Sequence, residues 1–122
     1  MSIQRSRAVI AASHSLSSYT GVYEVRSASD SAAPPIRYEV FVRAYALWVR
    51  TTAAAVEPGV DTEFDLMTAG GDDFHPRQYR NGTLIGDEID ELITFLMANG
   101  RATGFEVRGI AEDKILARAT RR

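Results

Sequence analysis

Asp87 to Asn99, with the sequence DEIDELITFLMAN, is the segment on which the predicted fold class depends. At 100° per residue, its large apolar side chains fall on one side of a helix, within an arc of about 140°. These side chains are Ile89, Leu92, Ile93, Leu96 and Met97. Asp87 can cap the N-terminus, and the acids that follow it favour the positive end of the helix dipole. Asn99 and Gly100 tolerate the left-handed backbone that ends many helices. The segment therefore predicts an amphipathic helix over residues 87–99.

Several other segments alternate between apolar and polar residues, with the period of two that indicates half-buried strands. The clearest alternation runs from Ile36 to Arg43, and weaker ones cover residues 19–26, 62–68 and 105–110. The apolar residues of 44–49 fit either the same strand after a bend or a new strand after a tight turn. Residues 111–122 fit either a hairpin strand or a terminal helix, and we favour the strand. Several strands, one helix and one or two further strands are typical of an α+β domain. We therefore expect an antiparallel sheet packed on one face by the amphipathic helix (87–99).

The composition is that of an ordinary globular protein. The chain has 122 residues, of which 45% are hydrophobic and 25% charged, and it has no cysteine. This excludes collagen-like and wholly disordered classes, as well as disulfides, thiolate zinc sites and cysteine nucleophiles. We interpret residues 1–18, rich in Arg and Ser, as an N-terminal arm, with a targeting segment as the alternative, and residues 19–122 as a single α+β domain. No apolar run reaches the length of a membrane span, so we expect no membrane partner and a cytoplasmic location.

The net charge of −2 conceals a segregated pattern, with +3 in residues 1–50, −8 in residues 51–91 and +3 in residues 92–122. The predicted helix start accounts for four acids of the central segment. The other candidates for one acidic surface are Asp61, Glu63, Asp65, Asp72 and Asp73. An acidic face gives fast, steered association with a basic partner. Our leading hypothesis is a non-enzymatic protein-binding or inhibitory domain, of the immunity, antitoxin or adaptor kind, that binds a basic protein through these five residues.

The alternative hypothesis is a small-ligand-binding domain or a small enzyme with a pocket between sheet and helix near His75. This histidine precedes Pro76, which predicts a loop, and it is the most suitable general acid or base outside the N-terminal arm. If the protein were an enzyme, its catalytic residues would be His75, Asp73 and Tyr79. Nucleophile elbows, phosphate loops and dinucleotide fingerprints are all missing from the sequence, so we favour binding over catalysis and expect no cofactor.

The sequence raises three further kinds of partner: a metal ion, a nucleic acid and a second copy of the chain. Asp61, Glu63 and Asp65 have the spacing of the first ligands of a calcium loop, but Leu66 occupies the position that needs glycine, so we expect no metal. The arginines of residues 37–50 lie among aromatic residues, a combination that binds single-stranded nucleic acid when exposed. We interpret these aromatic side chains as core, which makes a nucleic-acid partner unlikely. A homodimer through an open sheet face stays possible.

Overall fold

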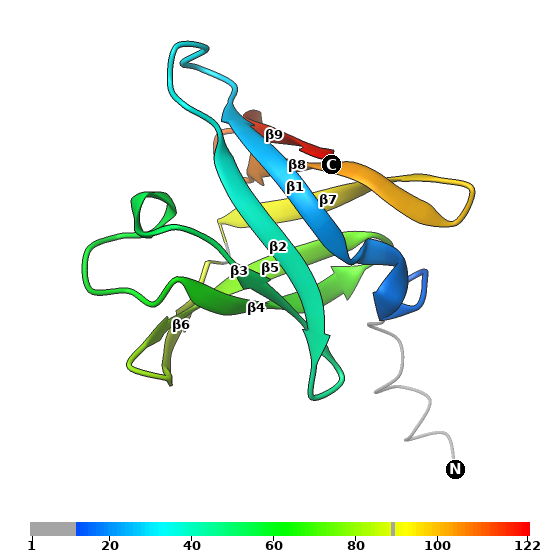
Figure 1. The fold of residues 1–122 in the computed structure, drawn as a ribbon, viewed down its shortest axis with the longest axis horizontal. Coiled ribbons are helices and arrows are strands. Elements are labelled where there is room, and N and C mark those ends of the chain that lie inside the picture. The colour runs from blue at the N-terminus through cyan, green and yellow to red at the C-terminus, as the bar shows by residue number, and fades with distance from the viewer. Residues whose placement is uncertain (1–11, 89) are drawn as a thin grey trace.

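The structure is a computed structural model that describes residues 12–88 and 90–122, and in these residues the chain forms strands and two short 3-10 helices but no α-helix (Figure 1). The 3-10 helices are η1 (Leu16–Tyr19) and η2 (Ala53–Ala55). The nine strands are β1 (Gly21–Ser27), β2 (Ile36–Arg43), β3 (Ala46–Arg50), β4 (Glu63–Gly70), β5 (Asp73–Arg80), β6 (Thr83–Asp87), β7 (Glu91–Ala98), β8 (Arg101–Gly109) and β9 (Lys114–Arg121). Within the described part of the chain, no helix is long and apolar enough to cross a membrane.

Eight of the strands close into an antiparallel barrel. The order around the ring is β1, β2, β3, β4, β5, β7, β8 and β9, and β9 pairs with β1 to complete it. Closure leaves these eight strands with neighbours on both sides, which removes the exposed edges of an open sheet. The ninth strand, β6, pairs with the far half of β5 as a hairpin outside the ring. The predicted open sheet is therefore wrong, and the fold is all-β.

The predicted helix over residues 87–99 is also wrong, because most of it is β7. This strand pairs with β8 along its whole length, from Glu91 opposite Gly109 to Ala98 opposite Arg101. Burial in the strand has a period of two: Ile93 and Phe95 are each 3% exposed in the core, whereas Leu96, which belongs to the predicted helical stripe, is 45% exposed on the outside. Pairing with β8, to which β7 is joined as a hairpin by the turn Asn99-Gly100, selects this period over the helical one. Ile89, also part of the predicted apolar stripe, lies outside the described residues.

The segment around His75 forms β5 rather than the predicted loop. Pro76 is accommodated because it lies between the part of β5 that pairs with β7 and the part that pairs with β6. Its carbonyl accepts a hydrogen bond from the Glu88 N–H at 2.8 Å. The N and O atoms of one residue point to the same side of an antiparallel strand. The N–H that proline lacks would therefore point to the side where β5 changes partner from β7 to β6, and no strand there needs it as a donor.

Other sequence predictions are confirmed. Strands cover residues 36–43 and most of the segments predicted at 19–26, 62–68, 105–110 and 111–122. Of the two alternatives for residues 44–49, the structure has the new strand, because Ala44 and Tyr45, both with positive φ, form a tight turn that separates β2 from β3. Asn81 and Gly82, with φ of 51° and 79°, form the turn that the Asn-Gly pair predicts.

The barrel is plugged at one end. Tyr19 of η1 is fully buried, and its ring meets those of Phe74 and Phe95 at centroid distances of 5.1 and 5.0 Å. The Tyr19 hydroxyl donates a hydrogen bond to Asp72 at 2.7 Å, and His14 contacts the same carboxylate at 2.9 Å. These contacts fix residues 12–20 across the end where the β4–β5 turn lies. Of the predicted arm (1–18), residues 1–11 lie outside the described residues.

Gly104 provides a test of this closed geometry. A Cβ atom at this position of β8 would fall well inside van der Waals contact with the carbonyl oxygen of Ala119 on β9. We expect Gly104→Ala to lower the free energy of unfolding by about 1–3 kcal/mol in urea denaturation, because the two backbones must separate. Gly86→Ala in β6 is the control, since its Cβ would meet no atom within 4 Å. Equal effects of the two substitutions would contradict the close β8–β9 approach.

Candidate ligand-binding site

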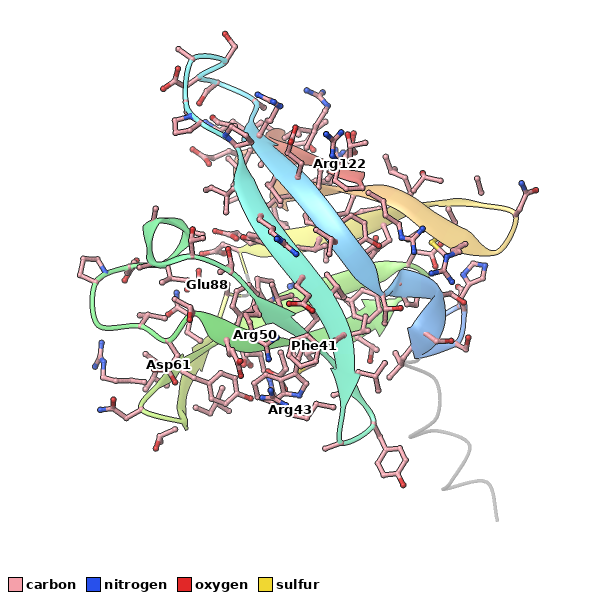
Figure 2. The ribbon with its side chains drawn as sticks, viewed as in Figure 1. Phe41, Arg43, Arg50, Asp61, Glu88 and Arg122 are labelled. Atoms are coloured by element: carbon pink, nitrogen blue, oxygen red, sulfur yellow. The ribbon has the colours of Figure 1, made fainter. Side chains whose placement is uncertain are left out.

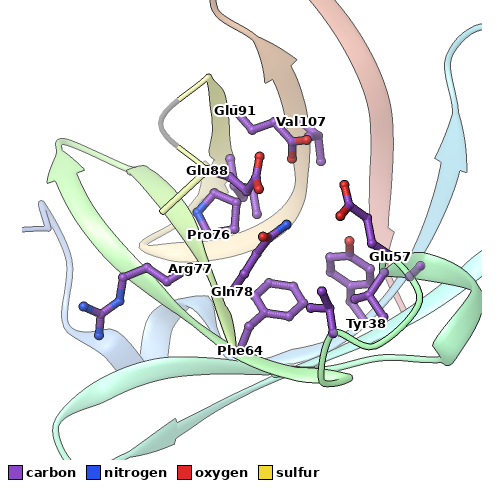
Figure 3. A pocket seen from close by; sticks show the side chains of 13 residues that line it. Tyr38, Glu57, Phe64, Pro76, Arg77, Gln78, Glu88, Glu91 and Val107 are labelled. Atoms are coloured by element: carbon purple, nitrogen blue, oxygen red, sulfur yellow. The ribbon is translucent and has the colours of Figure 1, made fainter. Parts of the chain in front are cut away.

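The end of the barrel opposite η1 contains a pocket with a volume of about 180 Å³ (Figure 3). Five barrel strands contribute to its wall, together with η2, the loop after it and the connection from β6 to β7. The lining residues are Tyr38, Ala55, Val56, Glu57, Val60, Phe64, Pro76, Arg77, Gln78, Glu88, Glu91, Ile93 and Val107. The pocket is thus built from segments that are far apart in the sequence and that only barrel closure brings together.

The floor of the pocket is apolar. Phe64, Ile93 and Val107 come from β4, β7 and β8, and their side chains belong to the buried core. Strand alternation turns these positions inward, so the floor continues the barrel interior. Val56 and Val60, from the segment between β3 and β4, add apolar surface at the side. A ligand in this pocket would therefore contact hydrocarbon on its inner side.

The mouth of the pocket is acidic. Glu57, Glu88 and Glu91 lie around it, and the hydroxyl of Tyr38 points toward it from below (Figure 3). Burial raises the pKa of the Glu91 carboxyl, and the negative charge of Glu88 raises it further. Burial also raises the pKa of Tyr38 to about 12, and the charge of Glu91 adds to this shift. Glu88, Glu91 and Tyr38 are thus close enough to influence one another electrostatically.

These polar groups have no protein partner in the described ranges, 12–88 and 90–122. None of the ion pairs found there involves Glu57, Glu88 or Glu91, and the Tyr38 hydroxyl makes no hydrogen bond there. Arg77 lines the pocket, but its guanidinium points away from it (Figure 3) and binds Asp65. The mouth therefore carries negative charge that no lining cation neutralises.

The carboxylates of the sequence-predicted acidic surface are mostly engaged within the protein. Asp61 accepts hydrogen bonds from the N–H groups of Asn81 and Gly82, both at 2.8 Å, and so holds the β5–β6 turn. Glu63 binds Arg43 and Arg50 on the outer face of the barrel, each at 2.9 Å. The first two candidates thus already satisfy partners on their own chain.

The remaining three candidates lie in two different places. Asp65 is only 5% exposed and binds the Arg77 guanidinium and the Tyr79 hydroxyl. Asp72 holds the plug at the opposite end of the barrel, and Asp73 lies in β5 opposite Thr94. The structure therefore does not bring the five carboxylates together as one free surface, and their role in partner binding stays a prediction.

The residues predicted as catalytic in an enzyme also lie apart from the pocket. Asp73, His75 and Tyr79 alternate along β5 with Phe74 and Pro76, which face the interior. The ring of His75 is hydrogen bonded to the backbone carbonyl of Glu91 at 2.8 Å, and Tyr79 binds Asp65. A pocket does lie beside β5, but among the described residues no α-helix forms one of its walls, and these three side chains are on the other face of the strand.

Sequence reasoning missed the residues at the mouth. It assigned Glu88 and Glu91 to the start of a helix and Tyr38 to the core. One signal was available: in a strand interpretation, Glu91 has the same parity as the buried Ile93 and Phe95, and a carboxylate on an inward-facing position is unusual.

A second cluster of aromatic and charged side chains covers the outside of β2 and β3 (Figure 2). The guanidinium of Arg43 lies 5.0 Å from the ring centre of Phe41 and 4.9 Å from that of Trp48, and Arg50 lies 4.8 Å from Phe41. Trp48 also stacks on Tyr79 at 5.3 Å. The interpretation of this region's aromatic residues as core is wrong for Trp48, which packs on the outer face, and for Tyr45, which is 97% exposed.

Comparison of the chain with protein-family models, with characterised proteins and with solved structures found no match in any of the three. In the described residues, no three side chains of His, Asp or Glu are grouped closely enough to hold one metal ion.

Glu91 gives a prediction about pH. Its carboxyl has a raised pKa in the folded state and its ordinary value, 4.5, in the unfolded chain, so the folded protein binds the proton more tightly. This contribution to stability is present below pH 4.5 and is lost as the pH rises through the raised value. We expect Glu91→Gln to increase the urea midpoint at pH 7 and to have little effect near pH 4. Glu112→Gln, in the exposed β8–β9 turn, is the control, and a pH-independent difference would contradict the assignment.

Asp65 gives a prediction about stability. Its replacement by Asn leaves the Arg77 guanidinium without its counter-charge in a largely buried position. We expect Asp65→Asn to lower the free energy of unfolding by about 2–3 kcal/mol, and Glu63→Gln, in an exposed pair, by less than about 1 kcal/mol. Denaturation of both variants in urea measures the difference. Unchanged stability of Asp65→Asn would instead leave this carboxylate available for a partner.

Proposed function

We propose that the protein binds one small organic molecule in the open end of its barrel. The observation that carries this proposal is the division of the pocket into an apolar floor, which continues the core, and a polar mouth. Ligand sites in proteins combine mostly hydrophobic walls with a few polar groups that fix orientation. An amphipathic ligand would place its apolar part against Phe64, Ile93 and Val107 and its polar group near the carboxylates.

The size of the pocket limits the ligand. An enclosed apolar cavity of about 150 Å³ accepts benzene, and pockets for drug-sized molecules measure roughly 300–1,000 Å³. The pocket here is about 180 Å³ and open at one side. It therefore fits a molecule with one ring or a short branched chain, with its polar group extending into the mouth.

The pocket wall is held in place before any ligand binds. Thr51 and Thr62 are joined by a backbone hydrogen bond of 3.0 Å across the loop that carries Val56 and Val60. The N–H of Asp61 donates to the carbonyl of Tyr79 at 2.8 Å and ties the loop to β5. A preformed wall supports ligand binding because less conformational entropy is lost when the ligand enters.

The same geometry makes the pocket a better candidate than the predicted acidic surface. A basic partner would have to compete with Arg43 and Arg50 for Glu63, and with Arg77 for Asp65. The groups at the mouth of the pocket have no such competitor among the described residues. Unengaged polar groups are where a new interaction adds most to the free energy of binding.

Benzyl alcohol is a suitable first probe. A ligand with about eight heavy atoms gains only a fraction of the ceiling of about 1.5 kcal/mol per atom, so we expect a dissociation constant near ~1 mM. Chemical-shift perturbation in amide NMR spectra should be centred on the pocket. Val56→Trp should fill the mouth and abolish the perturbation, whereas Leu84→Trp, on exposed β6, should leave it unchanged. Perturbations away from the lining residues, or binding that survives Val56→Trp, would contradict the proposal.

A further inference from the structure

We infer that the ligand of this pocket is an organic cation, such as a protonated amine, an amidine or a guanidinium, whose positive group binds at the mouth between Glu57, Glu88 and Glu91. The inference rests on the proposed function, because it identifies the chemistry of the ligand in the same pocket. It depends on three observations: the charge at the mouth, the aromatic surface beneath it and the spacing of the carboxylates.

The first observation is that three carboxylates share the mouth without an ion pair among the described residues. The carboxylates that are paired lie elsewhere, as Glu63 with Arg43 and Arg50 and Glu106 with Arg118. At the mouth, three carboxylates share one pocket, and the one arginine in the lining points out of it (Figure 3). A cationic group bound there would have the role that arginine has on the outer surface.

A bound cation would also relieve an electrostatic cost that the free pocket carries. Burial in the barrel removes water from the Glu91 carboxyl, and the negative charge of Glu88 repels it. Both effects disfavour its ionised form and raise its pKa. An opposite charge within about 4–6 Å favours the ionised form of a carboxyl group and offsets both effects. An anionic ligand would increase the same cost, so the pocket discriminates by the sign of the charge.

The second observation is the aromatic surface below the carboxylates. Tyr38 and Phe64 both line the pocket, with ring centres 6.1 Å apart in an edge-to-face arrangement. Ring faces attract cations, most strongly where water is excluded. The Tyr38 hydroxyl, which has no partner among the described residues, can accept a hydrogen bond from an ammonium or guanidinium N–H. Carboxylates, ring faces and one hydroxyl are together the groups that recognise organic cations.

The third observation is spacing. The carboxylates at the mouth are not grouped closely enough to share one metal ion, as noted above for the described residues. The floor beneath them supplies hydrocarbon, whereas a hard metal ion needs six or more oxygen ligands. A cation with several N–H donors and an apolar body satisfies the separated carboxylates and the floor at once.

A matched set of probes tests the inference: benzylamine, benzyl alcohol and phenylacetate, all measured near pH 7.5 by calorimetry and amide NMR. An alkylamine is protonated at this pH. Because its hydrogen bonds to carboxylates are charge-assisted, we expect benzylamine to bind at least about tenfold more tightly than benzyl alcohol. Phenylacetate should not bind measurably. Competition between the amine and the alcohol confirms that they occupy the same pocket.

Two variants assign the effect to the mouth. Glu91→Gln should weaken benzylamine binding about five- to tenfold, a larger loss than for benzyl alcohol, and its urea midpoint at pH 7 shows that the variant is folded. Glu39→Gln is the matched control, because it removes one negative charge from the outward side of β2, one residue from Tyr38. We expect its affinity for benzylamine to change by less than about twofold, because solvent and salt screen an outer charge.

The outcomes separate the two proposals. Binding of benzyl alcohol with an affinity equal to that of benzylamine, or tighter binding of phenylacetate, overturns the cationic ligand and leaves the pocket as a ligand site. Failure of all three probes to bind overturns the ligand site and the cation with it. Displacement of benzylamine by calcium or magnesium chloride, beyond the effect of sodium chloride at equal ionic strength, would instead assign the mouth to a metal ion.

Discussion

Pairing of β9 with β1 is the constraint on which the rest of the structure depends. These are the first and last strands of the described residues, and their register, from Tyr23 opposite Arg121 to Ser27 opposite Ala117, converts a sheet into a ring. In a ring, every second residue of every strand must face an interior of fixed width. The side chains at these positions then decide how far each end of the barrel is filled. Both the plugged end and the pocket follow from this one requirement.

The two ends differ because their inward side chains differ in size. Near η1, the interior contains the rings of Tyr19, Tyr23, Phe74, Phe95 and Phe105, whose neighbouring centres lie 5.0 to 5.9 Å apart. At the other end, the pocket lining combines two rings, those of Tyr38 and Phe64, with the smaller Ile93 and Val107, and η2 contributes Ala55 to the wall instead of a buried ring. The space that these side chains leave forms the pocket. Polar side chains can lie at this end of the barrel because the mouth is open to water.

The sequence predicted those strands in which a single period fits the residues. Ile36 to Arg43 alternates cleanly, and the Asn81-Gly82 turn has a backbone that few other residue pairs adopt. The apolar residues of 87–99 form a helical stripe, and in the strand one of them, Leu96, lies on the outside, so the apolar pattern by itself favours a helix. The strand is selected by pairing with β8, to which the Asn99-Gly100 turn joins β7 as a hairpin. β5 was missed because a proline such as Pro76 normally interrupts a strand ladder. It is tolerated here because β5 changes partner from β7 to β6 at this residue.

The candidate site was missed for a related reason. Its residues come from strands and loops that are distant in sequence, and the sequence offers ordinary local explanations for them, such as the first turn of a helix for Glu88 and a core ring for Tyr38. Only the barrel brings them to one opening. Once residues 91–98 are known to form a strand, Glu91 occupies an inward position where the rules of core packing call for an apolar side chain. A sequence that departs from those rules at one position, in a fold that otherwise obeys them, indicates a functional constraint at that position. The conflict between strand parity and residue type at Glu91 therefore supports the proposal that rests on the apolar floor and polar mouth of the pocket.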